Sequence, residues 1–539
     1  MKFLAIFRFE LSYQLRRAWP WAFFAVLLVL DFMMARDNSL AEALYDDFFV
    51  NSPFAIAKTA VVGGLVWLMV AAAVAGEAAA RDVATGMQPL TYTTPVSKAE
   101  YLGGRFLAAL VLNVLILLAV PAGIMLAVYW PGVPAEAIGP FRPAAYLTAF
   151  GFLVLPNAFF ATAIQFSLAA RTGRPMAAYL GSLLLFFAGF FVATYFVWFV
   201  ARDLGMMMDP IGVNFILDKL SHEWTTIEKS RRLILLEGTV LRNRLLWLGV
   251  GLVTVAFTYL RFRFAHRDES RWLKWWTRRR DARIATRLLS NSPRREAEST
   301  GSIAIGADAQ VFGWSLHARQ TIAIAGASFR SIAKSWPGLA MLAGIPLLTV
   351  PVVADQMSLN GVPLIPTTTQ VLQELTAPLS AELSRWMIVP LLTVFFAGEL
   401  VWRERDAGLG EITDAMPGTE WPRFLGQFIG LGIVLVVFVA LLALAGMVAQ
   451  AILGYHNFEP GLYVKVMFGL QLPEYLLFVV LALVAHVAVD QKYIGHLVAT
   501  IGYVVIALAS MFGLEHNLLI YGAGPGWSYT DMSGFGLSI

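Results

Sequence analysis

"GEAAARDVATGMQPLTYTTPVSKAEYLGG", residues 76–104, directly follows one of the most apolar stretches of the chain. A similar stretch, "GELVWRERDAGLGEITDAMPGTEWPRFLG", occupies residues 398–426 and also follows an apolar run. Each begins with a Gly-Glu pair, continues through a basic-acidic pair and a glycine, and reaches a proline shortly before the next apolar run. A polar pattern that returns at the same place in two halves predicts a chain built twice on one plan.

The composition is typical of a membrane protein. Of the 539 residues, 58% are hydrophobic and 14% are charged, and the mean hydropathy is +0.67. Soluble domains carry about 45–50% apolar and about 25% charged residues. We therefore expect an all-α polytopic membrane protein. Cysteine is absent, which excludes disulfides and thiolate metal sites, and the first residues do not show the pattern of a cleavable signal.

Eleven apolar runs approach the length of about 20 residues that a membrane-spanning helix needs. The predicted spans are residues 20–36, 56–78, 105–130, 143–170, 176–200, 244–262, 338–355, 385–402, 424–453, 464–489 and 497–513.

Basic residues predict how these spans are oriented, because Lys and Arg concentrate in cytoplasmic loops. The N-terminal segment 1–19 and the turn 171–174 are basic, whereas the loop 37–55 is mostly acidic. The stretch 261–295 holds twelve basic residues against three acidic ones. All the basic segments fall on one side if the N-terminus is cytoplasmic, and eleven spans then place residue 539 on the outer side.

The internal repeat extends beyond the opening stretch. An offset of 322 aligns residues 75–106 with 397–428 without a gap, and an offset of 317 aligns "LVLPN" at 153–157 with "LQLPE" at 470–474. Two six-helix bundles in tandem are predicted. Their organisation is an elbow helix at 1–19, a first bundle at 20–262, a basic linker with a second elbow helix at 263–337, a second bundle at 338–513, and an outer segment at 514–539. The second copy lacks a counterpart of span 244–262, so we expect a twelfth span beyond residue 539; a natural end at 539 is the alternative.

The repeated stretch also carries helix-start signals. Pro95 and the spacing of Ser97 and Glu100 suit a helix N-terminus with a capping box. Thr419 is the corresponding capping candidate in the second half. We expect a short amphipathic helix at about 91–104 and another at about 413–426, each docking a cytosolic partner; an ordinary solvated loop is the alternative. Just before them, Glu77 is expected to pair with Arg81, and Glu399 with Arg403, as structural latches one helical turn apart.

The order of elbow helix, span, outer loop, span and then "GE…RD..TG…LT.TTP.SK..YL.G" resembles the ABC-2 type transporter permeases. With "LRNRLLWLGVG" at 241–251 and "YTDMSGFG" at 529–536, the arrangement also looks similar to a subgroup in which an M1-aminopeptidase-like region follows the permease. The resemblance implies that 91–104 and 413–426 are coupling helices, which contact an ATPase subunit, and that the chain lies in the bacterial cytoplasmic (inner) membrane. The coupling residues expected on this basis are Glu77, Arg81, Thr94, Pro95, Ser97, Lys98, Tyr101, Glu399, Arg403, Pro417, Thr419, Glu420 and Trp421.

The sequence contains neither a complete M1 peptidase motif nor the phosphate-binding motif of an ATPase. The M1 motif H-E-x-x-H is incomplete, because the pair His222-Glu223 lacks the second histidine. A phosphate-binding G-x-x-x-x-G-K-[ST] loop is also absent from the sequence. We therefore expect a translocator without its own cofactor or catalytic residue. ATP and Mg²⁺ would be bound by a separate ATPase subunit, two copies of which would serve one chain; a permease homodimer is the less favoured arrangement.

Ionisable groups within spans are candidates for function because they are costly in a membrane. Glu474 and its counterpart Asn157 are expected either to face a central cavity or, for Glu474, to bond a neighbouring helix. Asp31, near the outer end of the first span, is expected to be a solvated interface residue.

The linker at 263–337 combines basic and aromatic side chains, a pattern that also occurs in nucleic-acid-binding segments. Its position directly after a span favours contact with anionic lipid, which stabilises binding by about 1 kcal/mol per basic residue, and no nucleic acid is expected. The residues assigned to the membrane surface are Arg271, Trp272, Lys274, Trp275, Trp276, Arg278, Arg279 and Arg280.

Three functions are compatible with these features. The favoured one is the membrane permease of an ABC-2 type transporter, with export of an unidentified substrate. The second is a membrane anchor or signalling scaffold for a C-terminal peptidase-like region. The third is an ion-driven secondary carrier that uses Glu474.

Overall fold

The structure is a computed structural model of the chain. It describes residues 2–36, 38–264, 313–359, 362–363, 365–381, 384–406, 408–415, 419–489, 491–509, 514, 516–524, 526–530 and 534–535. The predicted membrane-surface residues of the linker, from Arg271 to Arg280, and Pro417 lie outside the described residues.

The described residues are mostly helical. The helices of the first half are α1 (Lys2–Leu15), α2 (Ala18–Arg36), α3 (Asn38–Tyr45), α4 (Pro53–Ala84), α5 (Gln88–Tyr92), α6 (Lys98–Leu117), α7 (Ala119–Tyr129), α8 (Pro143–Ala149), α9 (Leu155–Thr172), α10 (Ala177–Phe187), α11 (Thr194–Phe199), α12 (Arg202–Met208), α13 (Ser221–Glu223), α14 (Thr226–Arg231) and α15 (Gly238–Arg261). Those of the second half are α17 (Trp314–Ala333), α18 (Trp336–Leu339), α19 (Ile345–Gln356), α20 (Thr368–Leu375), α21 (Ile388–Val401), α22 (Arg403–Asp406), α23 (Gly410–Asp414), α24 (Trp421–Ile452), α25 (Pro460–Tyr463), α26 (Leu472–Ala488) and α27 (Lys492–Ala507). A short antiparallel hairpin pairs β1 (Ser358–Leu359) with β2 (Val362–Pro363).

Nine helices in the described part of the chain are long and apolar enough to cross a membrane. The chain is therefore an all-α polytopic membrane protein, as its composition predicts. Each of the eleven predicted spans coincides with a helix, but two of those helices, Ile388–Val401 and Ile494–Ala507, are shorter than the other nine. The 14 residues of α21 cover about 21 Å at 1.5 Å per residue, less than the roughly 30 Å of a bilayer core.

The Gly-Glu pairs lie within helices and not at their ends. Helix α4 continues past Gly76 to Ala84, and α21 continues past Gly398. The glycines instead allow close packing. A Cβ on Gly76 would lie 2.5 Å from the carbonyl oxygen of Pro175, and one on Gly398 would lie 2.2 Å from the His496 ring. Both glycines thus let the segment that begins the fifth span of their half approach closely.

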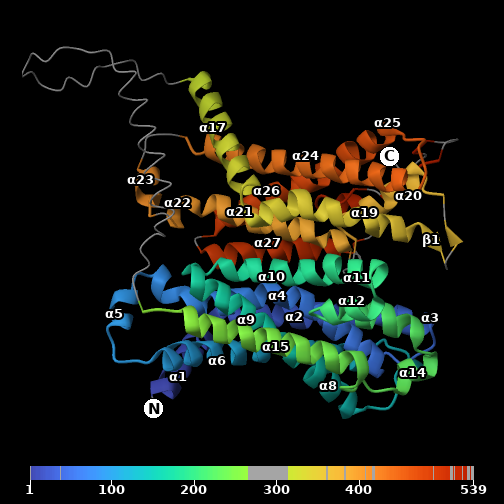
Figure 1. Ribbon diagram of the computed structural model, residues 1–539, viewed down its shortest axis with the longest axis horizontal. Helices are drawn as coiled ribbons and strands as arrows, with labels where there is room; N and C mark the ends of the chain where they lie inside the picture. Colours follow the sequence, from blue (N-terminus) through green and yellow to red (C-terminus); the bar gives the residue numbers. More distant parts are fainter. Residues whose placement is uncertain are drawn as a thin grey trace, which may run out of the picture.

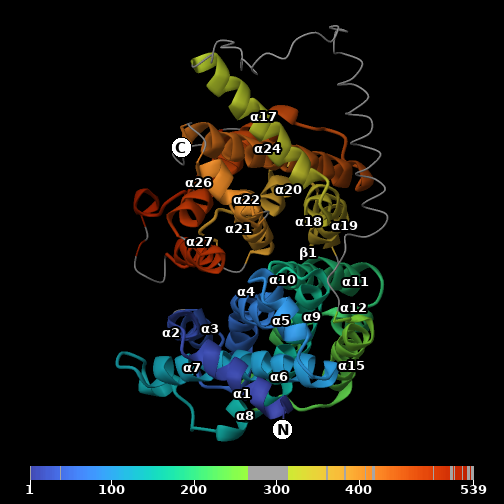
Figure 2. The same cartoon turned by 90° about the vertical axis from the view of Figure 1, so that its left-hand side faces the viewer.

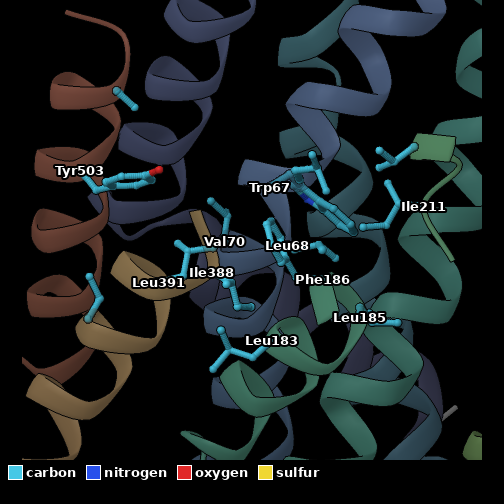
Figure 3. Packing of buried hydrophobic residues seen from close by; sticks show 14 of the residues in the cluster. Trp67, Leu68, Val70, Leu183, Leu185, Phe186, Ile211, Ile388, Leu391 and Tyr503 are labelled. Carbon is cyan, nitrogen blue, oxygen red and sulfur yellow. The ribbon is translucent and has the colours of Figure 1, made fainter. Parts of the chain in front are cut away.

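The helices form two groups that follow the sequence, residues 2–261 and 314–507 (Figure 1). In the first group α1 packs on α6, α2 on α7 and α4 on α9; in the second, α17 and α19 pack on α24, and α21 packs on α26. Figure 2 shows the two groups stacked, with α4 and α10 facing α21 and α27. The apolar core continues across this boundary, where Val70 and Leu183 lie near Ile388 and Leu391 (Figure 3).

A π-helical stretch precedes the same proline in each half. Residues Phe150–Val154 lead into Pro156, and Val464–Gln471 lead into Pro473. A proline removes one backbone donor and crowds the preceding turn, and π-turns accommodate such irregularities within helices. The Leu-Pro pair that recurs in the sequence is therefore preceded by a π-helical stretch in both halves.

Candidate functional site

The ends of the second and third spans meet α1 in what we call the charge cluster, which consists of Glu10, Arg17, Glu77, Arg81, Asp82 and Arg105. Figure 1 draws this region at the end of the molecule that carries the N-terminus, α5, α22 and α23, here named the α5 end. Three carboxylates face three guanidinium groups. The balance matters because a buried charge is tolerated only when it is paired and hydrogen-bonded.

Helix α1 provides the centre of this cluster. Glu10 is fully buried, and its two carboxylate oxygens accept hydrogen bonds of 2.9 and 2.7 Å from Arg81. Arg17, at the end of α1, forms an ion pair of 2.8 Å with Glu77. The predicted latch between Glu77 and Arg81 is therefore wrong. Both residues bind α1 instead, because that helix lies across α6 beside the end of α4.

A second buried pair connects α4 with α6. Arg105 donates to Asp82 at 2.6 Å and to the carbonyl oxygen of Ala78 at 3.1 Å. The hydroxyl of Tyr101 donates to the other Asp82 oxygen at 3.0 Å. Of these, only Tyr101 belongs to the expected coupling residues. Glu10, Asp82 and Arg105 could have been suspected from the sequence only as charges near the ends of apolar runs, since their partners lie up to 95 residues away.

The second half places corresponding groups at the same positions. Gln427, the counterpart of Arg105, donates to the carbonyl oxygen of Leu400 at 3.2 Å, just as Arg105 donates to Ala78. Arg423, the counterpart of Tyr101, pairs with Glu404 at 2.9 Å. Both of these hydrogen-bonding pairs keep the offset of 322. The sequence repeat is thus matched by a repeat of contacts.

The carboxylate of Glu399 is bound differently from that of Glu77. Lys492 contacts Glu399 at 3.3 Å and Asp406 at 2.5 Å. Arg403 begins the short helix α22. The expected pair between Glu399 and Arg403 is therefore replaced by a contact with the start of α27.

The predicted short helices are displaced towards the N-terminus. Ser97 and Glu100 form the expected capping box, but Lys98 opens the long helix α6 rather than a separate short one. In the second half the residues from Trp421 onward likewise belong to the 32-residue helix α24. The separate short helices are α5 and α23, which lie just before the predicted positions. The capping box therefore marks the start of the third span.

The remaining expected coupling residues surround these two helix starts. Thr94 donates to the carbonyl oxygen of Thr91 at 2.6 Å, and the carbonyl oxygen of Pro95 accepts from Lys2. The ammonium group of Lys98 lies 5.9 Å from the ring centroid of Tyr259.

Thr419 does not cap its helix, contrary to the expectation. The N-cap position of α24 is Glu420, and its side chain makes no capping hydrogen bond. The Thr419 hydroxyl instead lies 3.3 Å from the His317 ring nitrogen. Trp421 packs on Trp314 and His317 of α17, with centroid distances of 5.7 and 5.4 Å.

The short helices expose apolar side chains in matching positions. Met87 and Leu90 are 50% and 66% exposed, and their counterparts Leu409 and Ile412 are 48% and 62% exposed. Both pairs keep the offset of 322, and the helices α5 and α23 that carry them lie at the same end of the molecule (Figure 1).

Glu474 and Asn157 lie at the opposite end of the molecule and anchor loops. Glu474 accepts hydrogen bonds from the backbone N–H groups of Leu379 and Gly524, at 3.1 and 3.0 Å. Asn157 donates to the carbonyl oxygen of Ile211 at 3.0 Å and accepts from Arg244 at 2.5 Å. Glu474 also lines a cavity of about 620 Å³ together with loop residues such as Pro378, Tyr521 and Gly524.

Two further polar sites lie around Asp31 and around the neighbouring rings of His486 and His496. The environment of Asp31 differs from the predicted one, and the contact between the two histidines was not predicted. Asp31 is fully buried and both carboxylate oxygens are unpartnered, so the expectation of a solvated interface residue is wrong. It fits against Gly63, where a Cβ would lie 2.2 Å from its Oδ1. The rings of His486 and His496 are 4.4 Å apart, and Tyr179 of the first half packs on His496 at 4.9 Å.

At the α5 end, buried ion pairs connect α1, α4 and α6 of the first half, whereas the ion pairs of the second half are partly exposed. Among the described residues no group of three or more His, Asp or Glu side chains is arranged to hold a metal ion. No protein-family model, no curated protein and no solved structure matches the chain.

Proposed function

We propose that the chain consists of two ABC-2 type bundles in tandem and acts as the membrane permease of a transporter powered by a separate ATP-binding subunit. The membrane would be the bacterial cytoplasmic membrane, with the α5 end in the cytoplasm. Export is the favoured direction. The observation that carries the proposal is the matched pair of exposed apolar surfaces on α5 and α23.

Two equivalent surfaces suit two equivalent partners. An ATPase that works as a dimer would place one copy under each short helix, and one permease chain would serve both copies. Met87 and Leu90 would contact one copy, Leu409 and Ile412 the other. Force would reach the spans of the first half through the charge cluster, which joins α4, α6 and α1 directly behind α5.

The elbow helix α1 also supports a membrane setting. Its buried residues are the polar Glu10 and Gln14, whereas Phe3, Leu4 and Phe9 are exposed. A helix with polar groups inward and apolar groups outward suits a lipid environment. The same arrangement would be unfavourable against water.

The alternatives receive less support. A scaffold for a peptidase-like region would not require two matched surfaces at the α5 end. An ion-driven carrier would need a Glu474 carboxylate that is free to exchange ions, but loop amides hold both of its oxygens.

The proposal is tested by purifying the tagged chain from its native membrane and measuring the ATPase activity and the bound ATPase copies per chain. Leu90→Asp or Ile412→Asp should each reduce two bound copies to one, and the double variant should lower co-purifying activity at least tenfold, equivalent to about 1.4 kcal/mol of binding. Leu518→Asp is the matched control, because this leucine is 89% exposed but belongs to neither α5 nor α23. Unchanged stoichiometry and activity in the double variant would contradict the proposal.

A further inference from the structure

The two groups of helices meet through equivalent helices. Helices α4 and α10 of the first half face α21 and α27 of the second (Figure 2). The sequence offset of 322 aligns α4 with α21, and the offset of 317 aligns α10 with α27. A contact between two copies of the same surface has a two-fold axis at its centre. A residue that touches its own counterpart across this boundary therefore lies close to that axis.

Tyr179 is such a residue. Its ring packs on the ring of His496 with centroids 4.9 Å apart, and His496 is its counterpart at the offset of 317. Both residues are buried, with exposed fractions of 4% and 2%. The Nε2 atom of His496 has no hydrogen-bond partner among the described residues, so this side of the ring can move without breaking a hydrogen bond.

The His496 ring is connected to the α5 end of its own half. Its Nδ1 donates to the carbonyl oxygen of Lys492 at 2.8 Å, and the ammonium group of Lys492 contacts Glu399 at 3.3 Å and Asp406 at 2.5 Å. Asp406 is the last residue of α22, which packs on α23. A displacement of α22 and α23 would therefore reach His496 through one lysine.

Tyr179 is connected to its half at the equivalent place. Pro175, four residues earlier, touches α4, because a Cβ on Gly76 would lie 2.5 Å from its carbonyl oxygen. The next residue of α4, Glu77, forms the ion pair with Arg17. Each ring thus lies about one helical turn beyond the residue that contacts the Gly-Glu pair of its half. The ring pair therefore occupies the α5 end of the boundary, on its axis.

Carriers built from two repeats bind and pass their cargo at the boundary between the repeats. We propose that Tyr179 and His496 form the inner gate of the translocation path, closed in this structure and opened when the two halves move apart at the α5 end. The inference rests on the proposed function as a transporter. It deepens that function by naming the two side chains whose bulk decides what enters the path from the cytoplasm.

The absence of cysteine from the chain permits a direct test by thiol labelling. The reporter is Leu183→Cys, one turn beyond Tyr179 on α10, because Leu183 is 4% exposed and lies near Ile388 and Leu391 of the second half (Figure 3). The probe is a membrane-impermeant maleimide, added to membrane vesicles whose cytoplasmic face is outward. Tyr179→Ala and His496→Ala should each raise the labelling rate about tenfold, which corresponds to about 1.4 kcal/mol in the opening equilibrium.

Two variants separate a gate from general loosening. Tyr179→Phe keeps the ring and should leave the labelling rate unchanged. Tyr475→Ala is the matched control, because Tyr475 is 3% exposed but belongs to α26, which packs on α21, α24 and α27 of its own half. Faster labelling in Tyr475→Ala to the same extent, or unchanged labelling in both alanine variants of the ring pair, would overturn the proposal.

A second measurement asks whether the gate moves. With both rings intact, ATP added to vesicles that retain the ATPase should raise the labelling rate of Leu183→Cys, because turnover populates the open state. A rate that ATP leaves unchanged would overturn the gate while the ATPase stoichiometry stays as expected. Failure of the proposed function is distinguishable, because it appears in the stoichiometry of the Leu90→Asp and Ile412→Asp double variant and not in the labelling of the alanine variants.

Discussion

The two elbow helices are attached to their bundles by different chemistry. In the first half α1 is joined to α4 and α6 by buried ion pairs around Glu10. In the second half α17 packs on α24 through small residues, where a Cβ on Gly430 would lie 2.6 Å from Ser328 and 2.8 Å from the carbonyl oxygen of Ala325. Both halves thus bring the elbow helix close to a glycine of the third span, Gly104 or Gly426, and the first half adds buried ion pairs. The geometry of the contact, and not its polarity, is what the two halves share.

The comparison also shows where each attachment is vulnerable. An ion pair in the interior is a weak source of stability as a pair, but removal of one member leaves an uncompensated buried charge. A close-packed glycine contact fails when a larger side chain is introduced. The two halves should therefore respond differently to charge removal and similarly to steric change.

The largest expected effect is the loss of a charge from the first half. Arg105→Met should lower the free energy of unfolding by about 3–5 kcal/mol, because Asp82 would remain buried without its main partner. The measurement is a denaturant titration of the purified protein in detergent.

Gln427→Met is the matched variant in the second half. It removes one hydrogen bond to the carbonyl oxygen of Leu400 and should cost about 1 kcal/mol. Equal losses in the two variants would show that the charges of the first half are not more sensitive than the neutral contact.

An intermediate effect is expected where both halves use glycine. A Cβ on Gly104 would lie 3.0 Å from Ile6 Cγ2, and one on Gly426 would lie 2.7 Å from Ile324 Cβ. Gly104→Val and Gly426→Val should each cost about 1–3 kcal/mol, measured by the same titration.

Gly249→Val serves as the control for these two variants, because a Cβ at Gly249 meets no atom within 4 Å. It should show only the small change in helix propensity. A loss at Gly104 without a loss at Gly426 would separate the two elbow contacts that the structure makes equivalent.

The smallest effect is expected for the exposed ion pair of the second half. The side chains of Arg423 and Glu404 are 34% and 37% exposed, and solvent screens such pairs. Arg423→Ala should change the free energy of unfolding by less than about 1 kcal/mol. A loss comparable to that of Arg105→Met would mean that this pair is as tightly coupled as the buried pair of Arg105 and Asp82.

The repeat and the spans could be predicted from sequence because both depend only on local sequence patterns. Apolar runs of sufficient length indicate membrane helices, and the motif at 76–104 is long enough to align with 398–426 without a gap. The capping box of Ser97 and Glu100 was also predictable, since its partners are three residues apart. Its meaning was not, because a cap marks where a helix starts and says nothing of how far it continues.

The partners of the charged residues could not be read in this way. Sequence spacing alone favours Glu77 with Arg81, which lie one turn apart on one helix. In the structure Glu77 pairs with Arg17, 60 residues earlier, and Arg81 pairs with Glu10, 71 residues earlier, so the local pair does not form. Asp31 is a similar case, because its burial depends on Gly63 and Gly123, which let α4 and α7 approach it closely.

The sequence by itself therefore determined the class of the protein, the approximate positions of its long apolar helices, and the duplicated motif. These follow from hydrophobic run length and from the repeat, neither of which requires knowledge of what packs against what. Only the tertiary structure decided that the Gly-Glu pairs lie within helices, that Arg81 binds Glu10 of α1, and that Asp31 is buried against Gly63. Those features depend on distances between residues far apart in the chain, which a linear pattern does not contain.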